Sequence, residues 1–149
     1  MPESQYLKTT GKAADADKLD GLDSKELSPE GRDGRTADLV LTQLGETVLS
    51  ATVTTPGSAA LLASASVSVF SDGGGDDQAT CFLRFDGTTS SAFYRTTIPD
   101  TAIADTASLP VVWAQPVGAG AHTVELRCHR NTTGNVTVDE AGLMVSAHL

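Results

Sequence analysis

At 149 residues the chain has room for one ordinary domain with its own core and an extension, but not for two full domains. Aromatic residues make up 5% and charged residues 19%, a balance that favours short β-strands joined by tight turns over amphipathic helices. Of the net charge of −9, residues 37–149 carry −7 and include no lysine, so no basic patch for phosphates and no nucleic-acid partner are expected.

No apolar run approaches the roughly eighteen residues that cross a bilayer, so no membrane partner is expected. The first residues are polar and lack the basic and apolar regions of a secretory signal peptide. This beginning favours synthesis in the cytosol over secretion.

Residues 1–37 are predicted to form an N-terminal anchoring arm and linker. Within the arm, residues 13–27 indicate an extended piece, a turn at Asp20-Gly21 and a short helical turn, with Asp23 and Glu26 in capping-box spacing. The three leucines of this stretch are too few to build a core, so they require a surface from another copy or a larger assembly. The residues expected to carry assembly and anchoring are Leu19, Asp20, Gly21, Leu22, Asp23 and Leu27.

Residues 28–37 are rich in Pro, Gly and charge and are interpreted as a linker. Residues 38–149 are predicted to form the β-sandwich head. Residues 46–53 alternate in polarity, and residues 60–70 alternate more strictly, with apolar side chains at odd positions from 61 to 69 and serines at 64, 66 and 68. That pattern is typical of a strand with one buried and one solvated face.

Further strands are predicted around Cys81, over 90–98 after a turn at Asp86-Gly87, over 108–117 and over 122–128. Prolines at 110 and 116 place the 108–117 strand at an edge or give it bulged ends. In the last strand, 135–149, the alternation breaks at residues 139–140, which predicts a bulge. About eight short antiparallel strands at intervals of roughly ten residues indicate an all-β sandwich or jelly roll with an extended N-terminal arm.

The two cysteines, Cys81 and Cys128, each lie in a strand-like run. A disulfide across two paired strands would close a loop of about 47 residues and add roughly 3 to 4 kcal/mol. Two buried free thiols are the alternative. A lone pair of cysteines does not have the ligand spacing of a zinc site.

Candidate chemistry is sparse. The loop 72–77 has three carboxylates among three glycines but not the spacing of a calcium loop, so a solvated loop is favoured and no metal site is predicted. His122 and His129 fall on opposite faces of one strand and cannot act as a ligand pair within it. No nucleophile-elbow motif occurs, so we expect neither an enzyme nor a cofactor.

An aromatic platform is the remaining candidate for a ligand site. Trp113 and Tyr94, with Phe93, could stack on a sugar ring, whereas packing in the core is the alternative for a domain with few aromatic side chains.

The string ADKLDGLDS at residues 16–24 resembles a segment of fibre-like and decoration-like structural proteins of tailed bacteriophages and of surface proteins of high-GC Gram-positive bacteria. GAGAHTVELRC at residues 118–128, followed by residues 136–149, is similar to the closing strands of jelly-roll heads of the C1q and tumour-necrosis-factor type. The resemblance implies a homotrimer packed around a threefold axis. The short chain, with no collagen-like or coiled-coil stalk, favours a protein that sits directly on a shell over a fibre tip.

We therefore expect a virion structural protein: a homotrimeric capsid decoration or head-fibre protein that binds the major capsid or another virion protein through its arm. The expected location is the capsid surface rather than the tail tip. Two alternatives stay open: a tail-fibre head that binds a receptor or host-surface glycan through residues 71–78, residues 99–107 or the Trp113 face, and a secreted adhesin-like domain of a bacterial surface.

Overall fold

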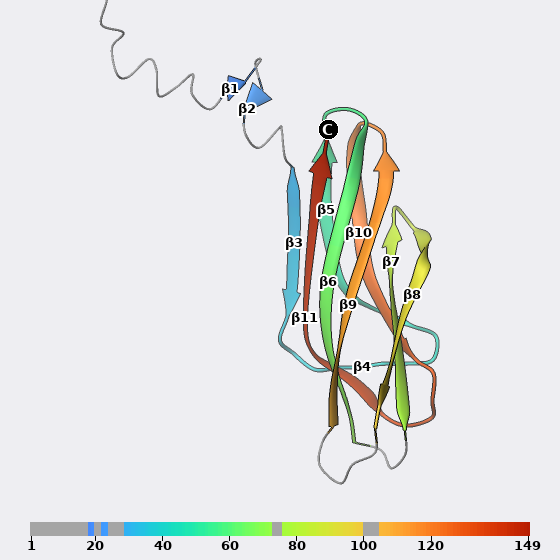
Figure 1. Ribbon diagram of the computed structural model, residues 1–149. Coiled ribbons are helices and arrows are strands. Elements are labelled where there is room, and N and C mark those ends of the chain that lie inside the picture. Colours follow the sequence, from blue (N-terminus) through green and yellow to red (C-terminus); the bar gives the residue numbers. More distant parts are fainter. Residues whose placement is uncertain (1–17, 20–21, 24–28, 73–75, 100–104) are drawn as a thin grey trace, which may run out of the picture.

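A computed structural model describes residues 18–19, 22–23, 29–72, 76–99 and 105–149 (Figure 1). These residues form eleven strands and no helix, and hence no helix long and apolar enough to cross a bilayer. The strands are β1 (Lys18–Leu19), β2 (Leu22–Asp23), β3 (Glu30–Arg35), β4 (Leu39–Val40), β5 (Glu46–Thr55), β6 (Ala59–Ser71), β7 (Asp77–Phe85), β8 (Thr88–Ile98), β9 (Asp105–Val117), β10 (Gly120–Arg130) and β11 (Val136–His148).

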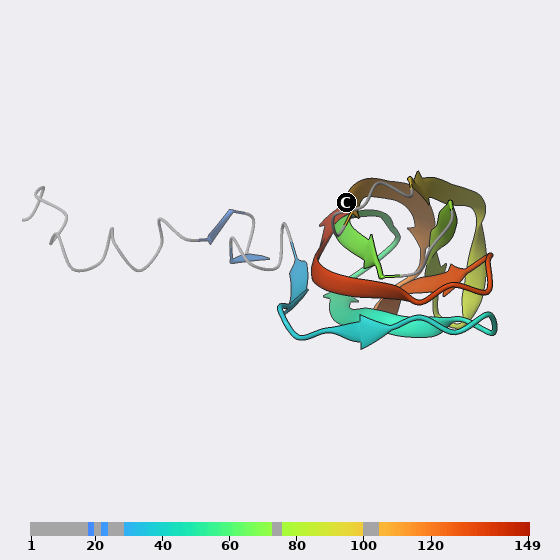
Figure 2. The same ribbon diagram turned by 90° about the horizontal axis from the view of Figure 1, so that it is seen from below.

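Two antiparallel sheets enclose one core and confirm the predicted β-sandwich. The β10 sheet has the order β5-β10-β7-β8, and the β11 sheet has the order β3-β11-β6-β9, with β4 also paired to β11. From β5 onward the chain crosses from one sheet to the other at every connection except that between β7 and β8, which are neighbours in the β10 sheet. Such alternation between two sheets is the connectivity of a jelly roll. Figure 2 shows the sheets end-on, curved around their shared interior.

The polarity pattern of the sequence determines which face of each strand is buried. In β6, the odd positions from Leu61 to Val69 are buried, and the three serines between them face outward, as predicted. In β11, the buried apolar positions are even up to Val138 and odd from Ala141, because the register with β6 shifts between Val138 and Glu140. The predicted bulge at the acidic pair is therefore present.

The linker interpretation of residues 28–37 is wrong for residues 30–35. Glu30–Arg35 is strand β3, which pairs with β11 from Glu30 to Arg35 and extends the β11 sheet by one strand. Gly31 is buried where β3 approaches β5, and a Cβ there would lie 2.7 Å from the carbonyl oxygen of Thr52. The glycine and the charges that suggested a linker instead serve a close approach and an exposed sheet edge.

Side chains bridge both seams between the sheets. Along one seam, the Asp33 carboxylate of β3 accepts the Ser50 N–H of β5 at 2.9 Å, and the Arg35 side chain donates to the Val48 carbonyl at 3.3 Å. Along the other seam, the Tyr94 hydroxyl of β8 donates to a backbone carbonyl of β9 at 2.6 Å. These side chains therefore satisfy three backbone groups at the sheet edges within the chain.

The arm contains a short antiparallel pair, β1 with β2, in which Leu19 lies opposite Leu22 and Lys18 opposite Asp23. Asp23 is thus the last residue of β2. The turn expected at Asp20-Gly21 and the helical turn expected over residues 24–27 lie outside the described residues.

Candidate assembly surface

The outer face of the β11 sheet carries exposed apolar side chains on three neighbouring strands. Ser64 of β6 lies opposite Met144 of β11 on one side and Val112 of β9 on the other. Leu62, two residues before Ser64, shares their face, and the exposed fractions of Leu62, Val112 and Met144 are 40%, 45% and 46%. These three side chains form one apolar strip across the sheet, which we call the β11-sheet strip.

The surroundings of this strip are uncharged over two whole strands. The outward positions of β6 from 60 to 68 and of β9 from 108 to 116 are Ala, Leu, Ser, Pro and Val without a single ionisable side chain. On the same face of the sheet, ionisable side chains occur on β3 and at Glu140 and His148 of β11. A contiguous, uncharged, partly apolar face on an acidic domain is typical of a protein contact surface.

A hollow adjoins the strip at Gly142 of β11, which has no side chain to fill it. Its volume is about 310 Å³, and Ser66, Ser68 and Ser108 contribute to its lining together with Glu140. Small residues on facing strands leave room for a side chain of a partner, as shape-complementary interfaces require.

The structure joins Cys81 and Cys128, so it has the disulfide rather than the two free thiols that the sequence left open. The residues face each other directly on β7 and β10, with 4.1 Å between Cα atoms and 2.09 Å between sulfurs. Both side chains are fully buried. The bond therefore ties together the two central strands of the β10 sheet from inside the core.

The three aromatic residues proposed as a platform do not share a face. Tyr94 and Trp113 pack against the core from β8 and β9, and Tyr94 donates its hydroxyl hydrogen to the Val112 carbonyl. Phe93 points the opposite way and is 58% exposed, because neighbouring residues of a strand alternate between faces. The Trp113 indole N–H is buried without a hydrogen-bond partner in the described part of the chain. Tyr94 and Trp113 therefore pack along the sandwich core, and the three aromatic side chains do not form one platform.

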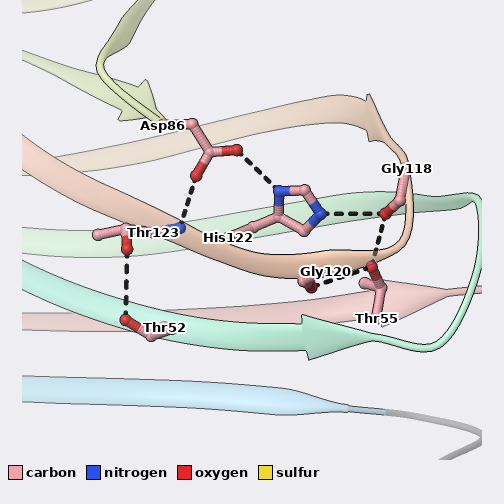
Figure 3. Close-up of polar contacts among 7 residues, drawn as sticks. All are labelled: Thr52, Thr55, Asp86, Gly118, Gly120, His122 and Thr123. Atoms are coloured by element: carbon pink, nitrogen blue, oxygen red, sulfur yellow. Dashed lines mark hydrogen bonds and ion pairs between the residues drawn. The ribbon is translucent and has the colours of Figure 1, made fainter.

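A polar network that the sequence did not reveal links the turns at one end of the sandwich (Figure 3). The Asp86 carboxylate accepts the Thr123 backbone N–H at 2.8 Å and lies 2.7 Å from Nδ1 of His122. Nε2 of the same ring is 3.0 Å from the Gly118 carbonyl oxygen. Since both partners are acceptors, the imidazolium is the form that satisfies both contacts.

The charges of this network stabilise each other. The hydrogen bond to Asp86 raises the pKa of His122, and the bond from His122 lowers the pKa of Asp86. The Asp86-Gly87 turn was predicted, but its pairing with a histidine 36 residues away was not. The network fixes the β7–β8 turn to the β9–β10 turn.

At the other end, the buried Asp77 carboxylate accepts hydrogen bonds from Ser71 Oγ and, at 2.6 Å, from Thr132 Oγ1. The hydrogen bond from Ser71 has the largest effect in lowering the pKa of Asp77, and that from Thr132 lowers it further. This carboxylate of the acidic loop is therefore engaged by hydroxyl groups. No cluster of three or more His, Cys, Asp or Glu side chains in the described ranges is arranged to hold a metal ion.

Of the predicted anchoring residues, the structure places the backbones of Leu19, Leu22 and Asp23 in the β1–β2 pair. Asp20, Gly21 and Leu27 lie outside the described residues, as do the central parts of the loops 71–78 and 99–107.

In sequence, the chain matches no protein-family profile and no curated protein. Solved structures to which the chain is similar include the tumour necrosis factor Eiger of S. frugiperda, with 10% identity over 83% of this chain and 92% of that chain and a TM-score of 0.46. Another is infectious bursal disease virus strain Gx, with 16% identity over 88% of this chain and 37% of that chain and a TM-score of 0.48. A third is a Bacillus endospore appendage, with 12% identity over 89% and 99% of the chains and a TM-score of 0.41. At these values the similarities carry no argument about function.

Proposed function

We propose that the protein is a non-enzymatic structural component of a virion: a homotrimeric capsid decoration protein whose head packs against its own copies and whose arm anchors it to the shell. The observation that carries this proposal is the row of uncharged outward positions on β6 and β9, with Leu62, Val112 and Met144 exposed on the same face of the sheet. An acidic domain that keeps two strands free of charge on one face has a surface suited to burial against protein.

The arm supplies the second element of the proposal. Its leucines require a surface, and the ADKLDGLDS string at residues 16–24 resembles segments of phage structural proteins. Strand β3 supports an anchoring role, because its pairing with β11 transmits a pull on the arm directly to a central strand of the head. The disulfide fits a particle that must persist outside a reducing cytosol.

Light scattering of the purified full chain tests the oligomer. The wild-type protein is expected to have the mass of three chains, and Val112→Asp combined with Met144→Asp is expected to yield monomers, because a buried unpaired carboxylate is costly. Leu44→Asp is the matched control: Leu44 is 96% exposed, lies outside the β11-sheet strip and should leave the trimer intact. A monomeric wild-type protein at micromolar concentration would refute the trimer.

Particle binding tests the anchor. Deletion of residues 1–28 removes the arm but keeps β3, so the head should retain its circular dichroism spectrum and lose binding to particles. Undiminished binding of the truncated chain to particles would contradict the anchoring role.

A further inference from the structure

The outer face of the β10 sheet differs in chemistry from that of the β11 sheet. Residues 37–149 contain four arginines, and three of them point outward from this one sheet, around two phenylalanines. We call this cluster the Arg–Phe face; its members are Phe82, Arg84, Phe93, Arg95 and Arg127.

Phe82 of β7 is the centre of the Arg–Phe face. Arg127 of β10 lies opposite it on one side and Phe93 of β8 on the other. The ring centroids of the two phenylalanines are 5.2 Å apart, and the ring of His129 is 6.2 Å from that of Phe82. Phe93 remains 58% exposed, so the paired rings present an apolar surface to whatever contacts the sheet.

The Arg–Phe face is positively charged although the head as a whole is acidic. Arg84 lies 3.8 Å from Glu125, whereas Arg95 and Arg127 form no ion pair with any described residue. The side chain of Arg95 donates to the Thr80 hydroxyl at 3.4 Å, and that of Arg127 donates to the Gly45 carbonyl at 3.1 Å, so their guanidinium groups are oriented by neutral partners. Guanidinium groups oriented in this way, beside an aromatic surface, are suited to carboxylates carried on an apolar segment.

The arm contains a segment with the complementary chemistry. Residues 13–27 hold five acidic side chains and two lysines, a net charge of −3, together with three leucines. A segment of this composition offers carboxylates to the arginines and aliphatic side chains to the phenylalanines. Beyond residue 37, no stretch of fifteen residues holds five acidic side chains and three leucines.

We infer that the Arg–Phe face binds residues 13–27 of the arm from a neighbouring copy. The arm enters the head at β3, which lies along the β5 side of the sandwich, whereas Phe93 and Arg95 are on β8 at the opposite edge of the β10 sheet. The sixteen residues from 13 to 28 reach about 50 Å when extended, enough to cross to an adjacent domain. The inference builds on the proposed anchoring role and gives the arm a binding surface on a second copy.

Carbodiimide cross-linking of the full chain tests this contact, because residues 37–149 contain no lysine. Arg95→Lys places a single amine on the Arg–Phe face, and a zero-length cross-linker should join it to a carboxylate of residues 15–26. The product should migrate as two chains on a denaturing gel, and mass spectrometry of its peptides should identify the arm. Thr54→Lys is the matched control, because Thr54 is exposed on β5 of the same sheet, far from the phenylalanine pair in the strand order, and should give no link to the arm of another chain.

Two results of this experiment would overturn the inference: no link from position 95 to the arm, or a link found only within single chains. A second measurement uses a labelled peptide of residues 13–27 titrated into the full-length protein and followed by fluorescence anisotropy. Phe93→Ser with Arg95→Gln should weaken peptide binding at least tenfold, while Val112→Ser, on the other sheet, should not. Equal binding to all three proteins would also refute the inference.

The outcome can be separated from that of the proposed function. Phe93→Ser with Arg95→Gln should remain trimeric by light scattering, since neither residue belongs to the β11-sheet strip. Failure of arm binding with an intact trimer and intact particle binding would remove the contact between copies and leave the decoration role standing.

Discussion

Reducing the Cys81–Cys128 disulfide should lower the free energy of unfolding by about 4 kcal/mol. The bond spans 47 residues, and the chain-entropy relation for closing a loop of that length gives this value at 25 °C. Reduction is the cleanest perturbation, because the two thiols occupy nearly the volume of the disulfide and leave no large cavity in the core. With a denaturant slope of about 2 kcal/mol per molar urea for a domain of this size, the unfolding midpoint should fall by about 2 M.

The assay is urea unfolding followed by circular dichroism, on protein refolded with and without reductant. Because both sulfurs are buried, the reduced sample must be unfolded, reduced and refolded before measurement. A protein carrying both Cys81→Ala and Cys128→Ala serves as the control and should show no response to reductant. If the wild-type midpoint moves by less than about 0.3 M, the unfolded chain is already restricted by other means and the entropic argument is wrong.

Two further predictions concern the first head strand and the polar network. Gly31→Ala should destabilise the protein by about 1 to 3 kcal/mol, because the added Cβ would lie 2.7 Å from the Thr52 carbonyl oxygen. The hydrogen-exchange rate of the β3 amides should rise as well. In the control Gly57→Ala, no atom lies within 4 Å of the added Cβ, so neither the stability nor the exchange rate should change. Folding raises the pKa of His122 above its usual 6.5. The contribution of the His122 imidazolium to stability is therefore complete below pH 6.5 and is lost as the pH rises through the raised pKa. The lowered pKa of Asp86 keeps the Asp86 carboxylate charged below pH 3.8. The stability difference between wild type and Asp86→Asn should therefore be larger at pH 6 than at pH 10, and an equal difference at both would show that the imidazolium is not involved.

Local patterns in the sequence were sufficient to predict the strands and their buried faces. The alternation in residues 60–70 is a property of adjacent residues, and β6 follows it without exception from Leu61 to Val69. The interruption at residues 139–140 likewise predicted a register shift that pairing with β6 shows between Val138 and Glu140. Such features depend on the two-residue period of a strand and need no knowledge of its neighbours.

Composition gave a wrong prediction where the same residue types occur both in linkers and in edge strands. Gly31 and the charges of residues 30–35 are typical of a linker, yet the same glycine allows β3 to approach β5, and the same charges suit a sheet edge. The distinction depends on what lies opposite, which only the tertiary structure supplies. The Arg–Phe face was missed for the same reason: Phe82, Phe93 and Arg127 are distant in sequence and become neighbours only through the strand order β10-β7-β8.

In the proposed assembly, contacts between copies should involve the faces of the sheets, because the sheet edges are poorly suited to pairing with another strand. Asp33 and Arg35 bond to backbone groups of β5, and Tyr94 bonds to a carbonyl of β9, so parts of these edges are occupied within the chain. Prolines at 110 and 116 also deprive β9 of two backbone donors, which hinders the addition of a strand from another molecule. With strand addition disfavoured, association depends on side chains, and the two outer faces have different ones: an uncharged apolar strip on the β11 sheet and arginines around phenylalanines on the β10 sheet. In the proposed assembly, the head binds its own copies through one face and an acidic, leucine-bearing segment through the other, so the two contacts do not compete.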